Sequence, residues 1–168
     1  AATTYSFTVK AKDAAGNVSA ASTAKSVTTL STSVTYCASK GSNVTYEWID
    51  YVAMGGMTNS TTKNNGYADF TATKIATVAL GASTTISYSA GFKSTKYTEY
   101  WRVWIDWNQN GTFETTELVA SKTSSVSTTL SSTFTVPTTA LIGATRMRVT
   151  MKYNAAPTAC ETFSYGEV

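Results

Sequence analysis

Short runs in which apolar and polar side chains alternate dominate this chain, and this period-two pattern constrains its fold more than any other feature. Within residues 97–106, Trp101, Val103 and Ile105 share one face of such a run, and the other face carries Arg102 and Trp104. Turns rich in glycine, serine and asparagine separate the runs, and no segment of useful length shows a helical period. The sequence therefore predicts an all-β, antiparallel β-sandwich of jelly-roll type. Other predicted strands cover residues 74–80, 84–90, 124–136 and 145–153.

Composition narrows the possible partners. Hydrophobic residues make up 42% of the 168 residues, enough for a core, whereas charged residues make up 14%, below the roughly 25% of ordinary soluble domains. The net charge of +3 is scattered, without a basic tail or stripe, so we expect no nucleic-acid partner. Because no apolar run approaches about 18 residues, we also expect no membrane span.

The chain contains no histidine, which excludes Ser-His-Asp and Cys-His catalysis and histidine-bound zinc. Carboxylates remain, and Glu47, Asp50 and Asp69 are candidates to converge as a glycosidase pair. Hydrogen bonds in turns and loops explain these carboxylates as readily. No nucleophile motif or catalytic metal cluster accompanies them, so we predict that the protein is not an enzyme.

Residues 1–30 have a pattern of their own. Apolar side chains alternate with polar ones over residues 5–11, and the turn sequence DAAGN follows before a second strand begins at Val18. Two strands cannot bury a core alone. This segment resembles the last two strands of a bacterial fibronectin type III domain, and we expect residues 23–33 to act as a linker. The chain is thus expected to be a piece of a longer protein.

The second region, residues 31–168, contains the two cysteines, Cys37 and Cys160, near its two ends. They are either a disulfide or two buried thiols. We expect a disulfide, which in the loop-entropy model contributes about 4–5 kcal/mol over so long a span. A disulfide indicates an oxidising compartment.

Several motifs of this region occur in an order that resembles the GEVED domain of secreted bacterial proteins. These motifs are YC at 36–37, YEWIDYV, NNGYADFTA, WRVWIDWNQNGTF, FTVP, GATRMRV, Cys160 and the final YGEV. The resemblance covers about residues 34–168. It implies a secreted or cell-surface bacterial protein, with fibronectin type III modules, peptidases or polysaccharide-degrading enzymes as adjacent domains of the parent protein.

The stretch DWNQNGTFETTE, residues 106–117, has the ligand spacing of a calcium loop, with Gly111 at the sharp turn. A strand precedes it, so Ca²⁺ would order a connection between strands and would not activate water. Two asparagines replace carboxylates, which weakens the expected affinity to about 10⁻⁴–10⁻³ M. The alternative is a turn that uses Asn and Gly for their geometry alone. The candidate ligands are Asp106, Asn108, Asn110, Thr112, Glu114 and Glu117.

A candidate binding surface follows if residues 97–106 pair with residues 145–153. The outer face would then carry cationic side chains around Trp104. An aromatic ring stacks on a sugar, and guanidinium groups bind sulfate or carboxylate through paired hydrogen bonds. The alternative is an ordinary solvated face with arginine stacked on tryptophan. The candidate ligand-binding residues are Arg102, Trp104, Arg146, Arg148, Lys152 and Tyr153.

These observations predict a non-catalytic accessory module that binds an extracellular, sulfated or acidic polysaccharide and is stabilised by calcium. The association of the resembling family with polymer-degrading enzymes points the same way. The alternative is a spacer or protein-interaction module that positions a neighbouring catalytic or adhesive domain and binds no glycan.

Overall fold

The computed structural model describes residues 4–28 and 34–168, and its contacts divide the chain into two units, Ala1–Val34 and Thr35–Val168. In the first unit, β1 (Thr4–Phe7) pairs antiparallel with β2 (Lys25–Thr28). The predicted turn forms at residues 13–17, where the Asp13 carboxylate accepts the Asn17 N–H at 2.8 Å.

The predicted hairpin is present, but its second arm extends further than predicted, and its regular pairing lies at the end away from the turn. Val18 forms an isolated bridge with Lys12, and the strand that pairs with β1 comes from the segment predicted as a linker. The side chains of Tyr5 and Phe7 are 52% and 57% exposed, because a two-stranded sheet offers them no second layer. The remainder of the predicted linker, residues 29–33, lies outside the described residues.

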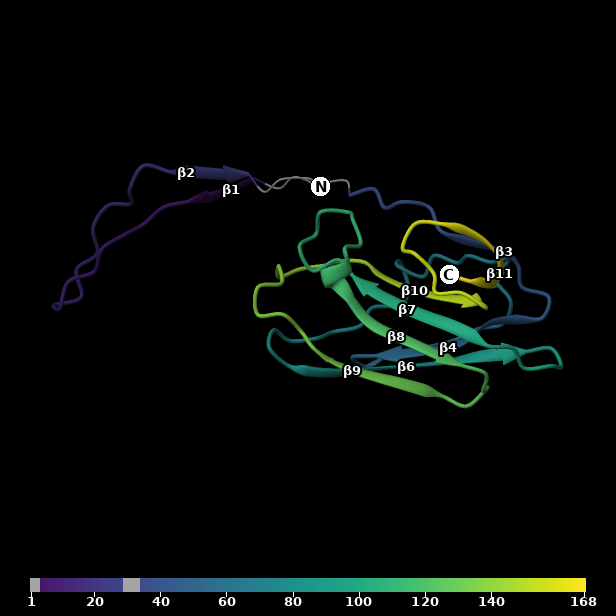
Figure 1. The fold of residues 1–168 in the computed structure, drawn as a ribbon. Coiled ribbons are helices and arrows are strands. Elements are labelled where there is room, and N and C mark those ends of the chain that lie inside the picture. Colours follow the sequence, from purple (N-terminus) through teal and green to yellow (C-terminus); the bar gives the residue numbers. More distant parts are fainter. Residues whose placement is uncertain (1–3, 29–33) are drawn as a thin grey trace. The chain divides into compact units, whose positions relative to one another are not determined.

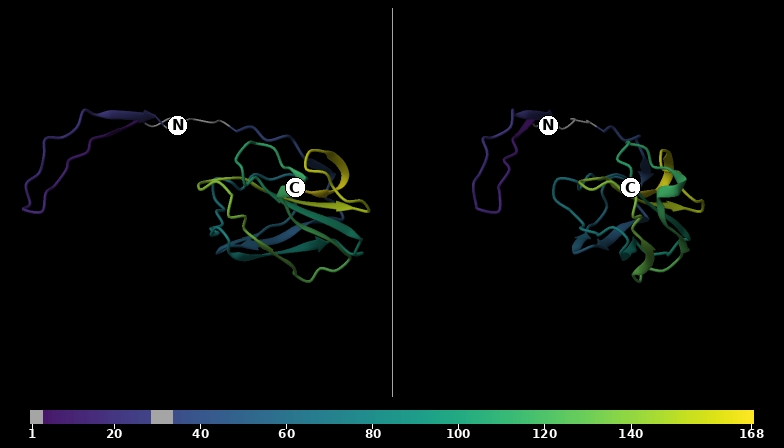
Figure 2. Two further views of the ribbon diagram at one scale, coloured as in Figure 1. Left: turned by 60° about the vertical axis from the view of Figure 1, so that its left-hand side comes forward. Right: turned by 90° about the vertical axis from the view of Figure 1, so that its left-hand side faces the viewer.

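Residues 34–168 fold into a β-sandwich of two sheets, which confirms the predicted fold class (Figures 1 and 2). The first sheet, in the order β3-β11-β10-β7-β8, contains β3 (Lys40–Asn43), β7 (Glu99–Ile105), β8 (Leu118–Ser124), β10 (Met147–Tyr153) and β11 (Thr162–Glu167). The second, in the order β5-β4-β6-β9, contains β4 (Glu47–Met54), β5 (Met57–Ser60), β6 (Ser83–Phe92) and β9 (Leu130–Thr135). A single 3₁₀ turn, η1 (Thr115–Glu117), precedes β8. In the described ranges, no helix has the length and hydropathy to cross a bilayer.

The strand pairs are antiparallel, as predicted, with one exception among the described residues: β11 pairs with β3 in parallel. The core lies between the sheets. On β7, Trp101, Val103 and Ile105 point inward as the alternation predicts, and Ile86 and Tyr88 of β6 meet them from the opposite sheet. Each such side chain contributes roughly 1.5–3 kcal/mol when buried, and a one-residue slip of β7 would move all three from the core to the outer face of the sheet, so this register is strongly specified.

Two predicted strand segments differ from the structure. Residues 74–80 form no strand, although Ala76 and Val78 pack against the core as the alternation suggests. The backbone N–H of Thr77 donates to the Gly55 carbonyl in the β4–β5 turn, so this segment crosses the end of that hairpin. The run 124–136 divides between the last residue of β8 and β9. The sequence did not reveal β8, because it is an edge strand that fully buries Ala120 alone.

The final residues have a structural role. Gly166 has a φ of 117°, and a Cβ there would collide with the Met151 carbonyl oxygen. The Glu167 carboxylate is 1% exposed and accepts the backbone N–H groups of Ile49, at 2.9 Å, and Asn64. Burial raises the pKa of Glu167, although its backbone N–H donors oppose that shift. Glu167 therefore ties β11 to the irregular part of β4, where the pairing register shifts.

Candidate functional site

The outer face of the first sheet is covered by protein. The predicted pairing of β10 with β7 is present and sets Arg148 directly opposite Trp104. However, Trp104 is 4% exposed and Arg148 is 6% exposed. The prediction of an exposed surface centred on Trp104 is therefore wrong.

Two segments, one at Cys37 and one at Ala159, contact Arg148 on this face. Its guanidinium donates to the Cys37 carbonyl at 2.7 Å and to the Ala159 carbonyl. A disulfide between Cys37 and Cys160 joins the same two segments covalently, as predicted. On β7, the Arg102 guanidinium donates to the Pro157 carbonyl at 3.1 Å. Burial lowers the pKa of Arg148, and its guanidinium also donates to the Cys37 sulfur at 3.3 Å.

The remaining predicted cations have acidic partners. Arg146 lies 3.6 Å from the Asp69 carboxylate and stacks over the ring of Tyr36. The Lys152 ammonium lies 2.9 Å from Glu161. Of the six predicted ligand-binding residues, Tyr153 is the one with an exposed side chain, at 39%.

Tyr153 belongs to a group of four aromatic side chains, here called the tyrosine cluster. It comprises Tyr46 from the turn before β4, Tyr97 from the β6–β7 loop, Tyr153 at the end of β10 and Tyr165 on β11. These segments meet at one end of the sandwich, on the right in Figure 1. Tyr46 and Tyr165 are 43% and 38% exposed. An exposed aromatic group of this kind marks a binding surface more often than isolated apolar residues do.

The four rings form a closed cycle in which each ring contacts two others. Centroid distances run from 5.6 Å between Tyr97 and Tyr153 to 6.3 Å between Tyr46 and Tyr97. Tyr165 closes the cycle at 6.2 Å from both Tyr46 and Tyr153. Sequence reasoning missed three of the four, since they are far apart in the chain. The available signal was that Tyr97 opens the predicted strand 97–106 directly after a turn and that Tyr153 closes the predicted strand 145–153.

Two buried carboxylates lie behind this cluster. Glu99 is directly opposite Tyr153 in the β7–β10 register, and Glu47 follows Tyr46 in the chain. Both are almost inaccessible, at 0% and 2% exposure, and neither Glu99 oxygen has a hydrogen-bond partner. Burial, together with the charge of Glu47, raises the pKa of Glu99 to about 8. Burial also raises the pKa of Glu47.

The three acidic residues considered for catalysis do not converge. Glu47 faces the interior, whereas Asp50 is exposed and Asp69 pairs with Arg146. A surface glycosidase needs two carboxylates that reach the same bond of a substrate. The pair that does lie close together, Glu47 and Glu99, is closed off from solvent.

The predicted calcium loop connects β7 to β8, at the other end of β7 from the tyrosine cluster (Figure 1). Asp106 is fully buried and organises the turn. Its carboxylate accepts the backbone N–H groups of Asn110, at 3.1 Å, and Gly111, at 2.9 Å. The Tyr36 hydroxyl donates to it at 2.7 Å. Burial, followed by this bond to Asp106, raises the pKa of Tyr36 to about 12.

At the centre of the loop, the side-chain amides of Asn108 and Asn110 both donate to the Glu114 carboxylate at 2.9 Å. Glu117 turns toward the start of the loop and accepts the Trp107 N–H at 2.8 Å, and Thr112 donates its N–H to Asn110. Within residues 4–28 and 34–168, no three acidic, histidine or cysteine side chains gather as a metal-binding group. Asn108, Asn110 and Glu114 meet at the loop centre, and carboxylate and amide oxygens are ligands that suit a hard cation.

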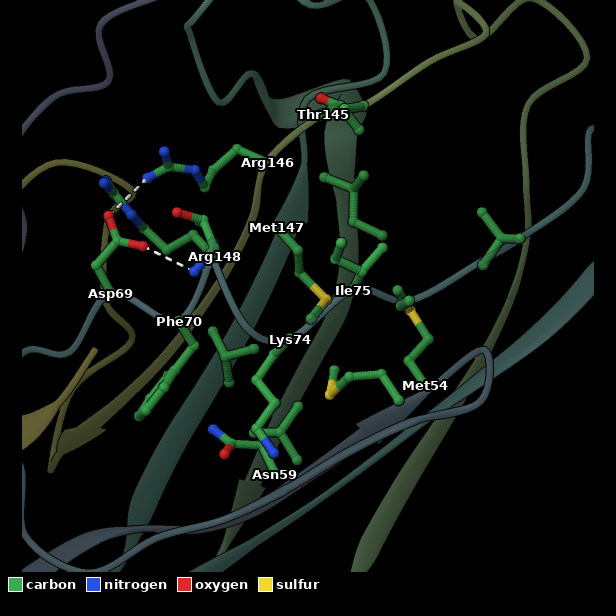
Figure 3. Close-up of a pocket in the computed structure, with 18 of the residues that line it drawn as sticks. Met54, Asn59, Asp69, Phe70, Lys74, Ile75, Thr145, Arg146, Met147 and Arg148 are labelled. Atoms are coloured by element: carbon green, nitrogen blue, oxygen red, sulfur yellow. Dashed lines mark hydrogen bonds and ion pairs between the residues drawn. The ribbon is translucent and has the colours of Figure 1, made fainter.

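A cleft of about 620 Å³ opens between β10 and the β4–β5 hairpin. Figure 3 shows Met54, Ile75 and Met147 lining it, with Arg146 and Asp69 paired at one side. Apolar side chains make up most of its wall, and polar side chains such as Asn59, Asp69 and Lys74 line it as well.

Comparison with known proteins found a family model that matches the C-terminal part of the chain. Residues 100–168 match the GEVED domain family. This match bears out the resemblance over that range and includes Tyr153 and Tyr165. The GEVED resemblance of residues 34–99 and the fibronectin resemblance of residues 1–30 stay predictions.

Two bacterial chitinases are similar to parts of the chain. Chitinase A1 of Niallia circulans is 36% identical over 110 residues, which cover 58% of this chain and 15% of that protein. Chitinase Chi52 of Paenibacillus xylanexedens is 83% identical over 29 residues, which cover 17% of this chain and 6% of that protein. The matched regions are thus small parts of both relatives. No solved structure matches the chain.

Proposed function

We propose that residues 31–168 form a non-catalytic accessory module of a secreted bacterial glycoside hydrolase and bind a polysaccharide at the tyrosine cluster. The observation that carries this proposal is the closed cycle of four tyrosines at one end of the sandwich, three of which have exposed side chains and one of which, Tyr97, is half-buried. Tyrosine combines an apolar ring face, which packs on the C–H face of a sugar, with a hydroxyl that bonds to sugar hydroxyls. The disulfide fits an extracellular location.

Chitin is the polymer we favour, because both matched relatives are chitinases. A neutral polymer also suits the charges on the molecule. Arg102 and Arg148 bond to backbone carbonyls, and Arg146 and Lys152 are paired with acids. Because these cationic groups already have partners, the sulfated or acidic polysaccharide expected from the sequence is the less favoured ligand.

The test is retention of the whole chain by chitin, cellulose, xylan and a sulfated polysaccharide, with Tyr46→Ala and Tyr153→Ala as site variants. We expect retention by chitin and its loss in both variants. Tyr5→Ala is a matched control, because Tyr5 is an exposed tyrosine in the other unit. Tyr67→Ala is a second control, because Tyr67 is exposed and lines the separate cleft.

Each departure from this result has a defined meaning. Retention by the sulfated polymer alone would restore the anionic ligand expected from sequence. If a folded chain is retained by none of the polymers, the module is a spacer that positions a neighbouring domain. Loss of binding in Tyr67→Ala, with the cluster variants unaffected, would move the site to the cleft.

We also propose that Ca²⁺ binds the loop at residues 106–117 and stabilises it. The ligand spacing and the meeting of Asn108, Asn110 and Glu114 support this. We expect Ca²⁺ at millimolar concentration to raise the melting temperature, and Glu114→Gln to abolish that rise. Because the loop and the tyrosine cluster lie at opposite ends of β7, chelation should leave sugar binding intact below the melting temperature. If neither Ca²⁺ nor chelator changes the melting temperature, the loop is a turn that binds no calcium.

For residues 1–30 we propose the C-terminal strands of a preceding fibronectin type III-like domain. The exposed apolar side chains of β1 support this, since a complete domain would cover them. We expect a longer chain that includes the preceding strands to protect the β1 amides from hydrogen exchange. Equal protection in the present chain would contradict the assignment.

A further inference from the structure

Neighbouring rings of the tyrosine cluster meet at steep angles. The rings of Tyr97 and Tyr153 are inclined by 80°, and those of Tyr153 and Tyr165 by 88°. Tyr46 is inclined by 69° to Tyr97 and by 48° to Tyr165. A crystalline polysaccharide presents a flat surface, and a protein surface that adsorbs it needs several aromatic rings in one plane. These four rings do not share a plane.

A hollow of about 290 Å³ opens beside the corner between Tyr153 and Tyr165. Lys152, Asn154, Ala155 and Ser164 complete its lining. The wall is therefore partly aromatic and partly polar, so it can meet both an apolar ring face and hydroxyl groups. The Lys152 ammonium is held by Glu161 at 2.9 Å, so its charge is already compensated. An uncharged ring with hydroxyl groups on its edge matches this lining.

Backbone hydrogen bonds and strand pairing hold the base of this site. Tyr153 and Asn154 end β10, and the Asn154 N–H donates to the Thr98 carbonyl at 3.1 Å. Asn154 has a positive φ of 57°, which turns the chain sharply after Tyr153. Ser164 and Tyr165 lie within β11, held by parallel pairing to β3. A site on strand ends keeps its shape when the ligand arrives, so little ordering cost opposes binding.

We propose that the tyrosine cluster binds a single free polysaccharide chain, with one sugar ring in the hollow between Tyr153 and Tyr165, and does not adsorb the flat face of a crystalline polymer. This inference rests on the proposed polysaccharide-binding function and specifies the physical form of its ligand. The sugar packs one face on a tyrosine ring and turns its edge hydroxyls toward Asn154 and Ser164. A projecting chain or chain end reaches such a concave corner, whereas a sugar within a flat crystal face does not.

The test compares three probes with the whole chain: the soluble hexamer of N-acetylglucosamine, amorphous chitin and crystalline chitin. We expect the hexamer and amorphous chitin to bind, and crystalline chitin to bind at least about tenfold more weakly per accessible sugar. Tyr165→Ala should weaken hexamer binding about five- to tenfold, whereas Tyr165→Phe, which keeps the ring, should retain most of it. Ser164→Ala should cost about fivefold. Asn154 is left unchanged, because alanine disfavours its positive φ.

The failures of the two proposals are distinguishable. Binding to crystalline chitin that depends on Tyr153 and Tyr165, without hexamer binding, would overturn the single-chain inference and leave the polysaccharide-binding function standing. Hexamer binding that is insensitive to both Tyr165→Ala and Ser164→Ala would remove the hollow as the site. If the wild-type chain is folded, with a cooperative melting transition, and binds none of the three probes, both proposals are overturned.

Discussion

Tyr153 and Glu99 are cross-strand partners on β10 and β7, yet one is 39% exposed and the other is fully buried. Partners in an antiparallel pair lie on the same face of the sheet. Tyr153 therefore stands at the rim of the sandwich interior, in front of a carboxyl group that has no hydrogen-bond partner. The proposed sugar-binding surface therefore lies next to the buried carboxyl group of Glu99, which has no hydrogen-bond partner.

Replacement of Glu99 by glutamine should stabilise the protein more as pH rises. Glu99 has a pKa of about 8 when folded, against an ordinary value of 4.5. Between these values the unfolded chain releases a proton that the folded protein keeps, so wild-type stability falls as pH rises from about 4.5 to 8. Glu99→Gln removes this loss, on the order of 4 kcal/mol at pH 8. Melting curves at pH 4.5 and 8 measure the effect.

The matched control is Asp50→Asn, since Asp50 is an exposed acid on β4. It should shift the melting temperature little and equally at both pH values. If Glu99→Gln and Asp50→Asn have the same pH profile, the raised pKa of Glu99 is contradicted.

Arg148→Ala should destabilise the fold and leave sugar binding intact at temperatures where the variant is folded. The substitution removes the buried guanidinium that donates hydrogen bonds to the carbonyls of Cys37 and Ala159. We expect a loss of about 2–4 kcal/mol in the free energy of unfolding. Arg146→Ala breaks a partly exposed ion pair and should cost less than about 1 kcal/mol. If Arg148→Ala loses polymer binding while its stability is unchanged, this prediction is contradicted and the outer sheet face becomes the candidate binding surface.

Gly166→Ala should cost several kcal/mol or prevent folding. Gly166 combines a φ of 117° with close contact to the Met151 carbonyl, so alanine adds both strain and a backbone collision. Gly56 also has a positive φ, of 84°, but a Cβ there would meet open space. Gly56→Ala should therefore cost only about 1 kcal/mol. Urea unfolding of the two variants separates collision from strain, and equal losses would argue against the packing around Gly166.

Loss of the Cys37–Cys160 disulfide should lower stability by about 4–5 kcal/mol, because the bond closes a very long loop in the unfolded chain. The double variant Cys37→Ser, Cys160→Ser should melt well below the wild type. The reducing agent should lower the melting temperature of the wild type toward that of the variant and leave the variant unchanged. A wild type that melts at the same temperature with and without reductant would contradict this role.

The sequence revealed the features that depend on alternation. The inward face of β7 and its pairing with β10 follow from period-two patterns in which only one face is apolar enough for the core. The prediction for the outward face was wrong, because alternation indicates which side of the sheet a residue occupies but not which segments cover that side. Trp104 and Arg148 point away from the core and are nevertheless buried.

The candidate site was harder to foresee because it is assembled at the end of the sandwich. Tyr46, Tyr97, Tyr153 and Tyr165 come from four separate segments, and their meeting depends on strand order and register. The parallel pairing of β11 with β3, which brings Tyr165 to this end, has no local signature in the sequence. The calcium-like spacing, by contrast, is local, and the turn it predicted at Gly111 is present.

The disulfide also determines how this unit transmits mechanical force. Cys37 and Cys160 are 123 residues apart in the chain but are joined directly, and β3 and β11 continue side by side in the same direction just beyond them. Tension applied along the chain from both sides would pass from Cys37 to Cys160 through the sulfur–sulfur bond. The β strands between these two cysteines would be spared that load. A module pulled between two neighbouring domains of one chain would thus keep the strands from β3 to β10 out of the load path, while the disulfide and β11, which follows Cys160, carry the tension.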